Sequence, residues 1–229
     1  MNPPPTVAFF GTGGYLLFSL GVAKFLKERY GLEQATAVTS SGGAVAAIAL
    51  LTLDVSEFDG LAERIATKMG KLHGDPIAWF KLGKTYREVL AMVVKPEVIP
   101  LLRNRLQIAT TVLPWFKKRI YSEPFHSVQE IILHLQASAY IPGYFPQLPS
   151  WCHLADVDAG LTMHTADYTG SVIVSPKYKT GVDIHLPIQK EKLSVLKAFP
   201  YERLMEIYEM GYERAKLEVI PLDVKLMRS

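Results

Sequence analysis

Residues 37–50 constrain the fold more than any other part of this sequence. They read AVTSSGGAVAAIAL, a β-prone segment, two glycines and a run of helix formers. This order predicts a strand, a sharp turn and a buried helix, with Ser41 at the corner. Gly43 satisfies the need for small residues there, whereas Thr39 stands where the G-x-S-x-G nucleophile elbow has its first glycine. A nucleophile and an ordinary N-cap serine remain the alternatives for Ser41.

A second glycine-rich turn precedes this one. Residues 6–10 predict a buried strand and residues 15–29 an amphipathic helix, and the turn between them is Gly11, Thr12, Gly13 and Gly14. Free N–H groups at a helix N-terminus form an anion site. Dinucleotide binding is disfavoured, because Leu16 occupies the third glycine position of its fingerprint. We expect an oxyanion hole facing the serine, and the alternative is a turn whose glycines have a purely steric purpose.

The order of elements predicts the fold class. Strand, helix, strand and helix, with glycines after both strands, indicate a parallel sheet whose strand exits share one edge. Further helices are expected over 55–69, 97–105, 127–138 and 201–219, with another segment over 75–94. Further strands are expected over 35–39, 108–113, 119–122, 154–157 and 171–175, and a loop over 141–146. We predict one three-layer α/β/α domain over residues 1–229, with a central, mainly parallel sheet.

A serine nucleophile needs a general base, and Asp158 is the strongest candidate. It follows an expected strand and precedes Ala159 and Gly160, where another segment can approach closely. A desolvated carboxylate hydrogen-bonded to the serine can act as the base. The alternatives are a turn-starting Asp158 and Asp156, a weaker competitor inside the strand. No histidine stands out among His73, His126, His134, His153, His164 and His185.

Composition excludes several classes of protein. The only cysteine, Cys152, permits no internal disulfide and fits a reducing compartment. A net charge of +3 does not call for nucleic acid. No His, Cys and carboxylate cluster has metal-ligand spacing. The N-terminus lacks a secretory n-region, and the longest apolar run is about half a membrane span. We therefore expect a cytoplasmic protein that contacts membranes peripherally.

Taken together, these motifs resemble the patatin-like phospholipase family, especially the animal branch that includes adipose triglyceride lipase and adiponutrin. The resemblance begins with the glycine turn and the serine elbow and continues with Asp158-Ala159-Gly160, which is similar to the family's DG[GA] motif. It extends through residues 125–128, 137–143, 171–176 and 199–212, so it covers about residues 5–218.

The resemblance implies a Ser–Asp dyad that acts on glycerolipid or phospholipid esters through an acyl-serine, with no cofactor and no metal. Carried over by position, Ser41 is the nucleophile and Asp158 the base. The oxyanion hole would comprise Gly11, Thr12, Gly13 and Gly14. Acyl transfer to another alcohol, contact with membranes or lipid droplets, and an unidentified protein activator also belong to this expectation.

Two departures from the family pattern keep other functions open. Thr39 brings a β-branched side chain into the corner, and Ala159 replaces the middle glycine of DGG. One alternative is a weakly active or inactive lipid-binding scaffold, and another is an esterase with a Ser–His pair. Residues 115–119, WFKKR, are expected to rest on an anionic membrane or to be a solvated charge run.

Overall fold

The computed structural model describes residues 4–11, 13–122, 124–141, 156–168, 170–176, 181–186 and 198–218, together with Leu222, Asp223 and Leu226. Thr12, Cys152, His153 and most of the loop expected over 141–146 lie outside the described residues.

The described strands form a single sheet. They are β1 (Thr6–Phe9), β2 (Thr36–Thr39), β3 (Leu106–Val112), β4 (Lys117–Tyr121), β5 (Asp156–Asp158) and β6 (Val172–Val174). Their order is β4-β3-β2-β1-β6, and β5 pairs with β3 off this path. Strands β1, β2, β3 and β6 run parallel, while β4 and β5 are antiparallel to β3. The expected mainly parallel sheet is confirmed.

The helices follow the predicted pattern closely. They are α1 (Leu16–Tyr30), α2 (Ala44–Thr52), α3 (Phe58–Gly70), α4 (Ala78–Val93), α5 (Ile99–Leu102), α6 (Val128–Ser138) and α7 (Tyr201–Leu217). Short 3₁₀ turns are η1 (Gly13–Tyr15), η2 (Ser41–Gly43), η3 (Val55–Glu57), η4 (Pro96–Val98), η5 (Ala159–Leu161) and η6 (Thr165–Tyr168). The segment expected over 75–94 contains α4. The helix expected over 97–105 is shorter, because the chain becomes extended at Arg103.

Local chemistry explains where several helices begin and end. A capping box precedes α3, in which Asp54 N–H donates to Glu57 Oε2 (2.9 Å). Ser127 Oγ accepts the Glu130 N–H (3.1 Å) and caps α6. Gly31 stops α1 with a φ of +71°, a left-handed conformation that glycine adopts without steric cost.

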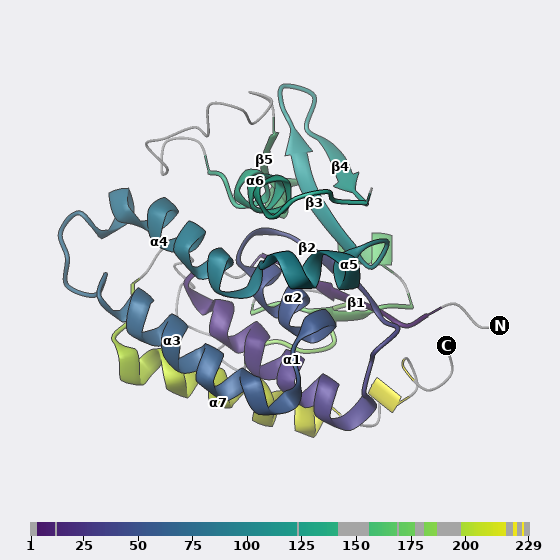
Figure 1. Cartoon of the computed structure of the whole chain (residues 1–229), viewed down its shortest axis with the longest axis horizontal. Helices are drawn as coiled ribbons and strands as arrows, with labels where there is room; N and C mark the ends of the chain where they lie inside the picture. The colour runs from purple at the N-terminus through teal and green to yellow at the C-terminus, as the bar shows by residue number, and fades with distance from the viewer. Residues whose placement is uncertain are drawn as a thin grey trace.

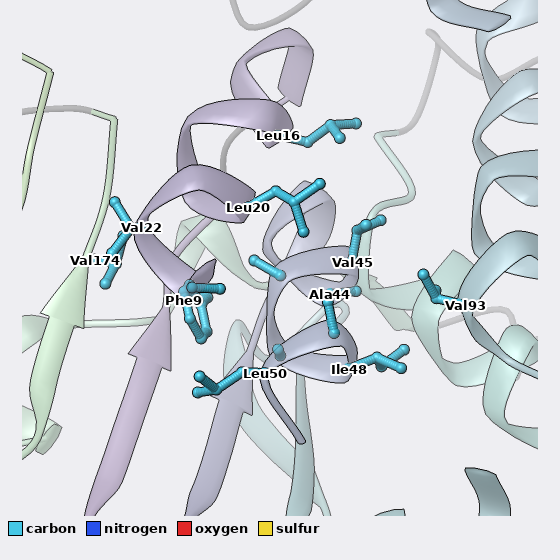
Figure 2. Close-up of a cluster of buried hydrophobic side chains, with 14 of the residues drawn as sticks. Phe9, Leu16, Leu20, Val22, Ala44, Val45, Ile48, Leu50, Val93 and Val174 are labelled. Atoms are coloured by element: carbon cyan, nitrogen blue, oxygen red, sulfur yellow. The ribbon is translucent and has the colours of Figure 1, made fainter. Parts of the chain in front are cut away.

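Helices α1 and α2 are buried between the sheet and an outer layer made by α3, α4 and α7 (Figure 1). Every residue of α2 from Ala44 to Leu51 is buried, as expected for a helix that is apolar on all sides. Figure 2 shows Leu20 of α1 and Ile48 of α2 in the same core as Phe9 of β1. The two helices that follow the glycine turns are therefore the most enclosed elements of the fold.

A second, smaller apolar cluster covers the other face of the sheet. The strands contribute Ala8, Phe10, Val38, Ala109 and Ile173, and the segment after β5 contributes Ala159, Met163 and Tyr168. In the part of the chain that the structure describes, 3₁₀ turns form this layer. The polar side chains discussed next lie mainly at the carboxyl edge of the strands, between this layer and the helices.

Candidate active site

Ser41 lies at the corner between β2 and α2, as the first residue of η2. Its φ is +52°, a left-handed conformation that few residues with a Cβ adopt and that stores conformational strain. Ser41 is buried, with 8% of its surface exposed. This is the strand–turn–helix corner that the sequence predicts, and it turns the Ser41 side chain away from the line of both elements.

Two side chains from other helices hold the backbone of Ser41. The Tyr86 hydroxyl, from α4, donates to the Ser41 carbonyl oxygen (2.6 Å). The Ser41 N–H donates to Ser138 Oγ (3.0 Å), and the Ser138 hydroxyl, from α6, donates to the Ala109 carbonyl oxygen (2.6 Å). The sequence analysis missed Tyr86 and Ser138, since both occupy ordinary helical positions in sequences that carry no motif.

Gly43 lies where β1 passes closest to the turn. A Cβ added to Gly43 would lie 2.6 Å from the Phe9 carbonyl oxygen, well inside van der Waals contact. The Ser40 N–H donates to the same oxygen (3.1 Å), which fixes β1 against the turn. This position therefore has room only for glycine.

Thr39 is the last residue of β2 and remains within the sheet. It pairs with Phe9 on one side and with Ile108 on the other. Its side chain is fully buried, and Thr39 Oγ1 has no hydrogen-bond partner among the described residues. The corner thus forms with threonine in place of the elbow's first glycine.

The sheet brings Asp158 to the end of β2. Residues 110–112 of β3 pair with both β4 and β5. Because β4 takes one side of β3, β5 must lie on the side that β2 occupies. Ile108 pairs with Thr39, and Thr110 pairs with Asp158. Ile108 and Thr110 are two residues apart, about 7 Å along β3. The side chains of both pairs, and so those of Thr39 and Asp158, therefore lie on the same face of the sheet.

The backbone and the carboxylate of Asp158 are both held in place. Its N–H donates to the Tyr140 carbonyl oxygen (2.8 Å). Asp158 Oδ1 accepts the Gly160 N–H (2.6 Å), a bond that starts η5. Burial raises the pKa of Tyr86, and the negative charge of Asp158 raises it further. The Asp158 carboxylate therefore affects the pKa of the same Tyr86 hydroxyl that donates a hydrogen bond to the Ser41 carbonyl oxygen.

Asp156 belongs to a different cluster. Its buried carboxylate accepts hydrogen bonds from the Tyr121 hydroxyl, from Arg119 (3.3 Å) and from Thr110 Oγ1 (3.4 Å). These partners tie β5 to β3 and β4. The contacts give Asp156 a structural purpose in holding β5 against the β3–β4 hairpin.

The first glycine turn lies beside the second, since η1 contacts η2. A Cβ added to Gly11 would lie 3.2 Å from Ser41 Cβ and 3.8 Å from Ser41 Oγ, so the bare backbone of Gly11 faces the serine. Gly13 begins η1 with a φ of +49°, and Gly14, the next residue of η1, is buried. Thr12, the remaining expected donor, lies outside the described residues.

Three of the described histidines, His73, His134 and His185, have neighbours other than Ser41. His73 Nδ1 is 3.3 Å from the Ala198 carbonyl oxygen. The His134 ring lies 4.1 Å from the Tyr121 ring. Burial lowers the pKa of His185, and the nearby Arg214 lowers it further. No group of three or more His, Cys, Asp or Glu side chains among the described residues could hold a metal ion.

Comparison with known proteins supports the fold class. No protein-family model matches the sequence, and no curated protein matches it significantly. Among solved structures, VipD from Legionella pneumophila is similar, with a TM-score of 0.52 and 10% sequence identity. The match covers 96% of this chain and 67% of the VipD chain. At this identity the similarity concerns the fold alone, an α/β fold with a mostly parallel sheet and flanking helices.

Proposed function

We propose that this protein is a lipid acyl hydrolase in which Ser41 is the nucleophile and Asp158 the general base. The observation that carries the proposal is the strained Ser41 corner, with a φ of +52°, together with the strand register around it. Thr39, two residues before Ser41, pairs with Ile108 of β3, and Asp158 pairs with Thr110, two residues further along the same strand. Residues kept in strained conformations are typical of active sites. The resemblance in motif order to patatin-like phospholipases and the similarity in fold to VipD support the reaction class.

The reaction begins when Asp158 accepts the Ser41 hydroxyl proton while Ser41 Oγ attacks the ester carbonyl carbon. The resulting oxyanion is stabilised by N–H groups of the turn formed by residues 11–14, and removal of one such donor typically costs about 3 kcal/mol. Asp158 returns the proton to the departing alcohol, and an acyl-serine remains. Water then loses a proton to Asp158 and attacks the acyl-serine carbonyl carbon. The bond to Ser41 Oγ breaks, the fatty acid leaves, and Asp158 returns the proton to Ser41 Oγ, which regenerates the hydroxyl.

The substrates in this proposal are phospholipids and acylglycerols, and an alcohol that replaces water would give acyl transfer. The chain itself supplies the nucleophile, the base and the oxyanion donors, so the steps require no cofactor. Such substrates reside in membranes and lipid droplets, and we place the protein in the cytoplasm, in peripheral contact with those surfaces. Among the helices of the described residues, none has both the length and the apolar composition needed to span a bilayer.

Labelling by a fluorophosphonate, followed by a lipid turnover screen, tests this proposal. Ser41→Ala should abolish labelling and turnover, whereas Ser40→Ala should retain both. Ser40 is a matched control, since it is the neighbouring buried serine and its Oγ has no hydrogen-bond partner among the described residues. Asp158→Asn should lower kcat by at least about a hundredfold, the typical contribution of a general base. Labelling that persists in Ser41→Ala would refute the assignment.

A non-catalytic lipid-binding protein is the second candidate. Two observations favour it: Thr39 in place of the elbow glycine, and Asp158 Oδ1 already bonded to the Gly160 N–H (2.6 Å). That bond is the turn-forming contact that an Asp with a purely structural purpose would make. Lipid binding without labelling or turnover would select this function. Activity that survives Asp158→Asn and is lost in a histidine variant would instead indicate a Ser–His pair.

A further inference from the structure

The tip of the β3–β4 hairpin exposes two adjacent aromatic side chains. Trp115 is 73% exposed and Phe116 is 62% exposed. Phe116 has a φ of +47°, an unusual conformation for a residue with a Cβ. Single exposed apolar residues are common on protein surfaces, but contiguous apolar patches mark interaction sites.

The hairpin tip and Ser41 lie at the same edge of the sheet. Strand β3 runs parallel to β2, and Ile108 is level with Thr39. From Ile108, β3 continues to Val112 before the turn. These four further residues extend the strand about 13 Å beyond the end of β2, at about 3.3 Å per residue. In Figure 1 the hairpin projects from the rest of the molecule.

Positive charge accompanies the aromatic pair. Lys118 forms an ion pair with Asp167, and Arg119 forms one with Asp156. Lys117 is exposed and has no ion pair with any acidic side chain in the described residues. The aromatic tip is thus followed directly by a cation available to an external anion. Aromatic rings beside lysine suit the headgroup region of a membrane with anionic lipids.

We propose that the hairpin tip, formed by Trp115, Phe116 and Lys117, docks on membranes that contain anionic phospholipids. The two aromatic rings enter the interface between headgroups and acyl chains, and Lys117 lies among the lipid phosphates. Docking turns the carboxyl edge of the sheet, and with it Ser41, toward the lipid. The benefit for catalysis rests on the proposed lipid hydrolase function, whereas the docking itself does not.

Vesicle co-sedimentation in a Ser41→Ala background tests the docking without turnover. Vesicles of phosphatidylcholine with about 30 mol% phosphatidylserine supply the surface charge of an anionic leaflet. Trp115→Ser combined with Phe116→Ser should weaken binding by about tenfold or more, because two apolar side chains no longer leave water. Leu217→Ser is the matched control, since Leu217 is 75% exposed at the end of α7, and its binding should equal that of the parent.

The charge component has a separate readout. Lys117→Glu should weaken binding to the anionic vesicles and leave binding to pure phosphatidylcholine vesicles unchanged. The difference in anionic-vesicle binding between this variant and the parent protein should become smaller as the salt concentration rises. Hydrolysis of a soluble short-chain ester should remain unchanged in the Trp115/Phe116 variant of the otherwise native protein, because this reaction needs no surface. Absence of ester hydrolysis together with intact vesicle binding would therefore reject the hydrolase and keep the docking site.

Two results would overturn the docking proposal. One is a parent protein that does not sediment with anionic vesicles, or a Trp115/Phe116 variant that sediments equally well. The other is concentration-dependent self-association, measured by light scattering, that the Trp115/Phe116 variant abolishes while vesicle binding stays the same. The second result would assign the hairpin tip to an interface between two copies of this chain.

Discussion

At the scale of single residues, Ser41 depends on partners that lie far away in the chain. Its carbonyl oxygen accepts a hydrogen bond from Tyr86 of α4, and its N–H donates to Ser138 of α6. A strained φ persists only where the surroundings fix it. We therefore expect Tyr86 and Ser138 to be positioning residues for the proposed reaction, acting through the Ser41 backbone.

Tyr86→Phe should lower kcat by about tenfold with little change in KM. The change removes one of the two hydrogen bonds to the Ser41 carbonyl oxygen, which also accepts the Ala44 N–H. A lost hydrogen bond typically costs about 0.5–1.5 kcal/mol, and the Ser41 corner can then relax. Steady-state kinetics with a soluble ester and the rate of fluorophosphonate labelling provide the measurement. Tyr168→Phe is the control, since the Tyr168 hydroxyl is buried with no hydrogen-bond partner among the described residues. A Tyr86→Phe enzyme that loses stability but keeps kcat would leave Tyr86 with a purely structural purpose.

At the scale of elements, α1 is held against α7 through reciprocal glycine contacts. A Cβ added to Gly21 of α1 would lie 2.0 Å from the Tyr208 carbonyl oxygen. A Cβ added to Gly211 of α7 would lie 2.1 Å from the Phe18 carbonyl oxygen. The two helices therefore meet backbone to backbone. Helix α1 directly follows the first glycine turn, so this contact also fixes the turn that faces Ser41.

Gly21→Ala should destabilise the protein by about 3 kcal/mol, because the new methyl group can only be accommodated by moving the helices apart. Urea unfolding followed by circular dichroism measures the change. Gly60→Ala in α3 is the matched control, because its nearest neighbour is the flexible end of Arg64 at 3.5 Å. The alanine there should raise stability by about 0.5–1 kcal/mol through helix propensity. Equal stability of both variants would mean that the α1–α7 contact adapts easily.

At the scale of the whole molecule, buried tyrosines link stability to alkaline pH. Burial raises the pKa of Tyr168 to about 12, with a further contribution from Asp167. Burial also raises the pKa of Tyr30 to about 12, helped by its hydrogen bond to Asp223. Tyrosine in an unfolded chain ionises near pH 10. Between about pH 10 and 12 the unfolded state therefore binds fewer protons than the folded state, and the free energy of unfolding falls as pH rises.

Tyr168→Phe should reduce this alkaline loss of stability. The variant should match the native protein at pH 8, because the Tyr168 hydroxyl has no hydrogen-bond partner in the described part of the chain. Near pH 11 it should be more stable than the native protein by on the order of 1 kcal/mol. Urea unfolding at several pH values measures both, with the exposed Tyr201→Phe as the control for a lost hydroxyl. Identical pH profiles for the Tyr168→Phe variant and the native protein would contradict the assignment.

The sequence by itself determined the elements and their class. The apolar stretches around the two glycine turns predicted β1, α1, β2 and α2 to within a few residues, because helix and strand periodicities are local properties. They also predicted the mainly parallel sheet, because short strand–helix repeats leave few other topologies. The corner at Ser41 followed from the same local pattern, since its strand, glycines and helix formers are contiguous in the chain.

Only the tertiary structure decided what surrounds Ser41. Strands β2 and β5 both pair with β3, and β5 pairs just beyond the point where β2 ends. This long-range register places Asp158 near the corner. Tyr86 and Ser138 reach the Ser41 backbone because α4 and α6 pack around it. Hydrogen bonds between residues so distant in the chain leave no periodic signal in the sequence. They exist only once burial of the apolar helices has brought the elements together.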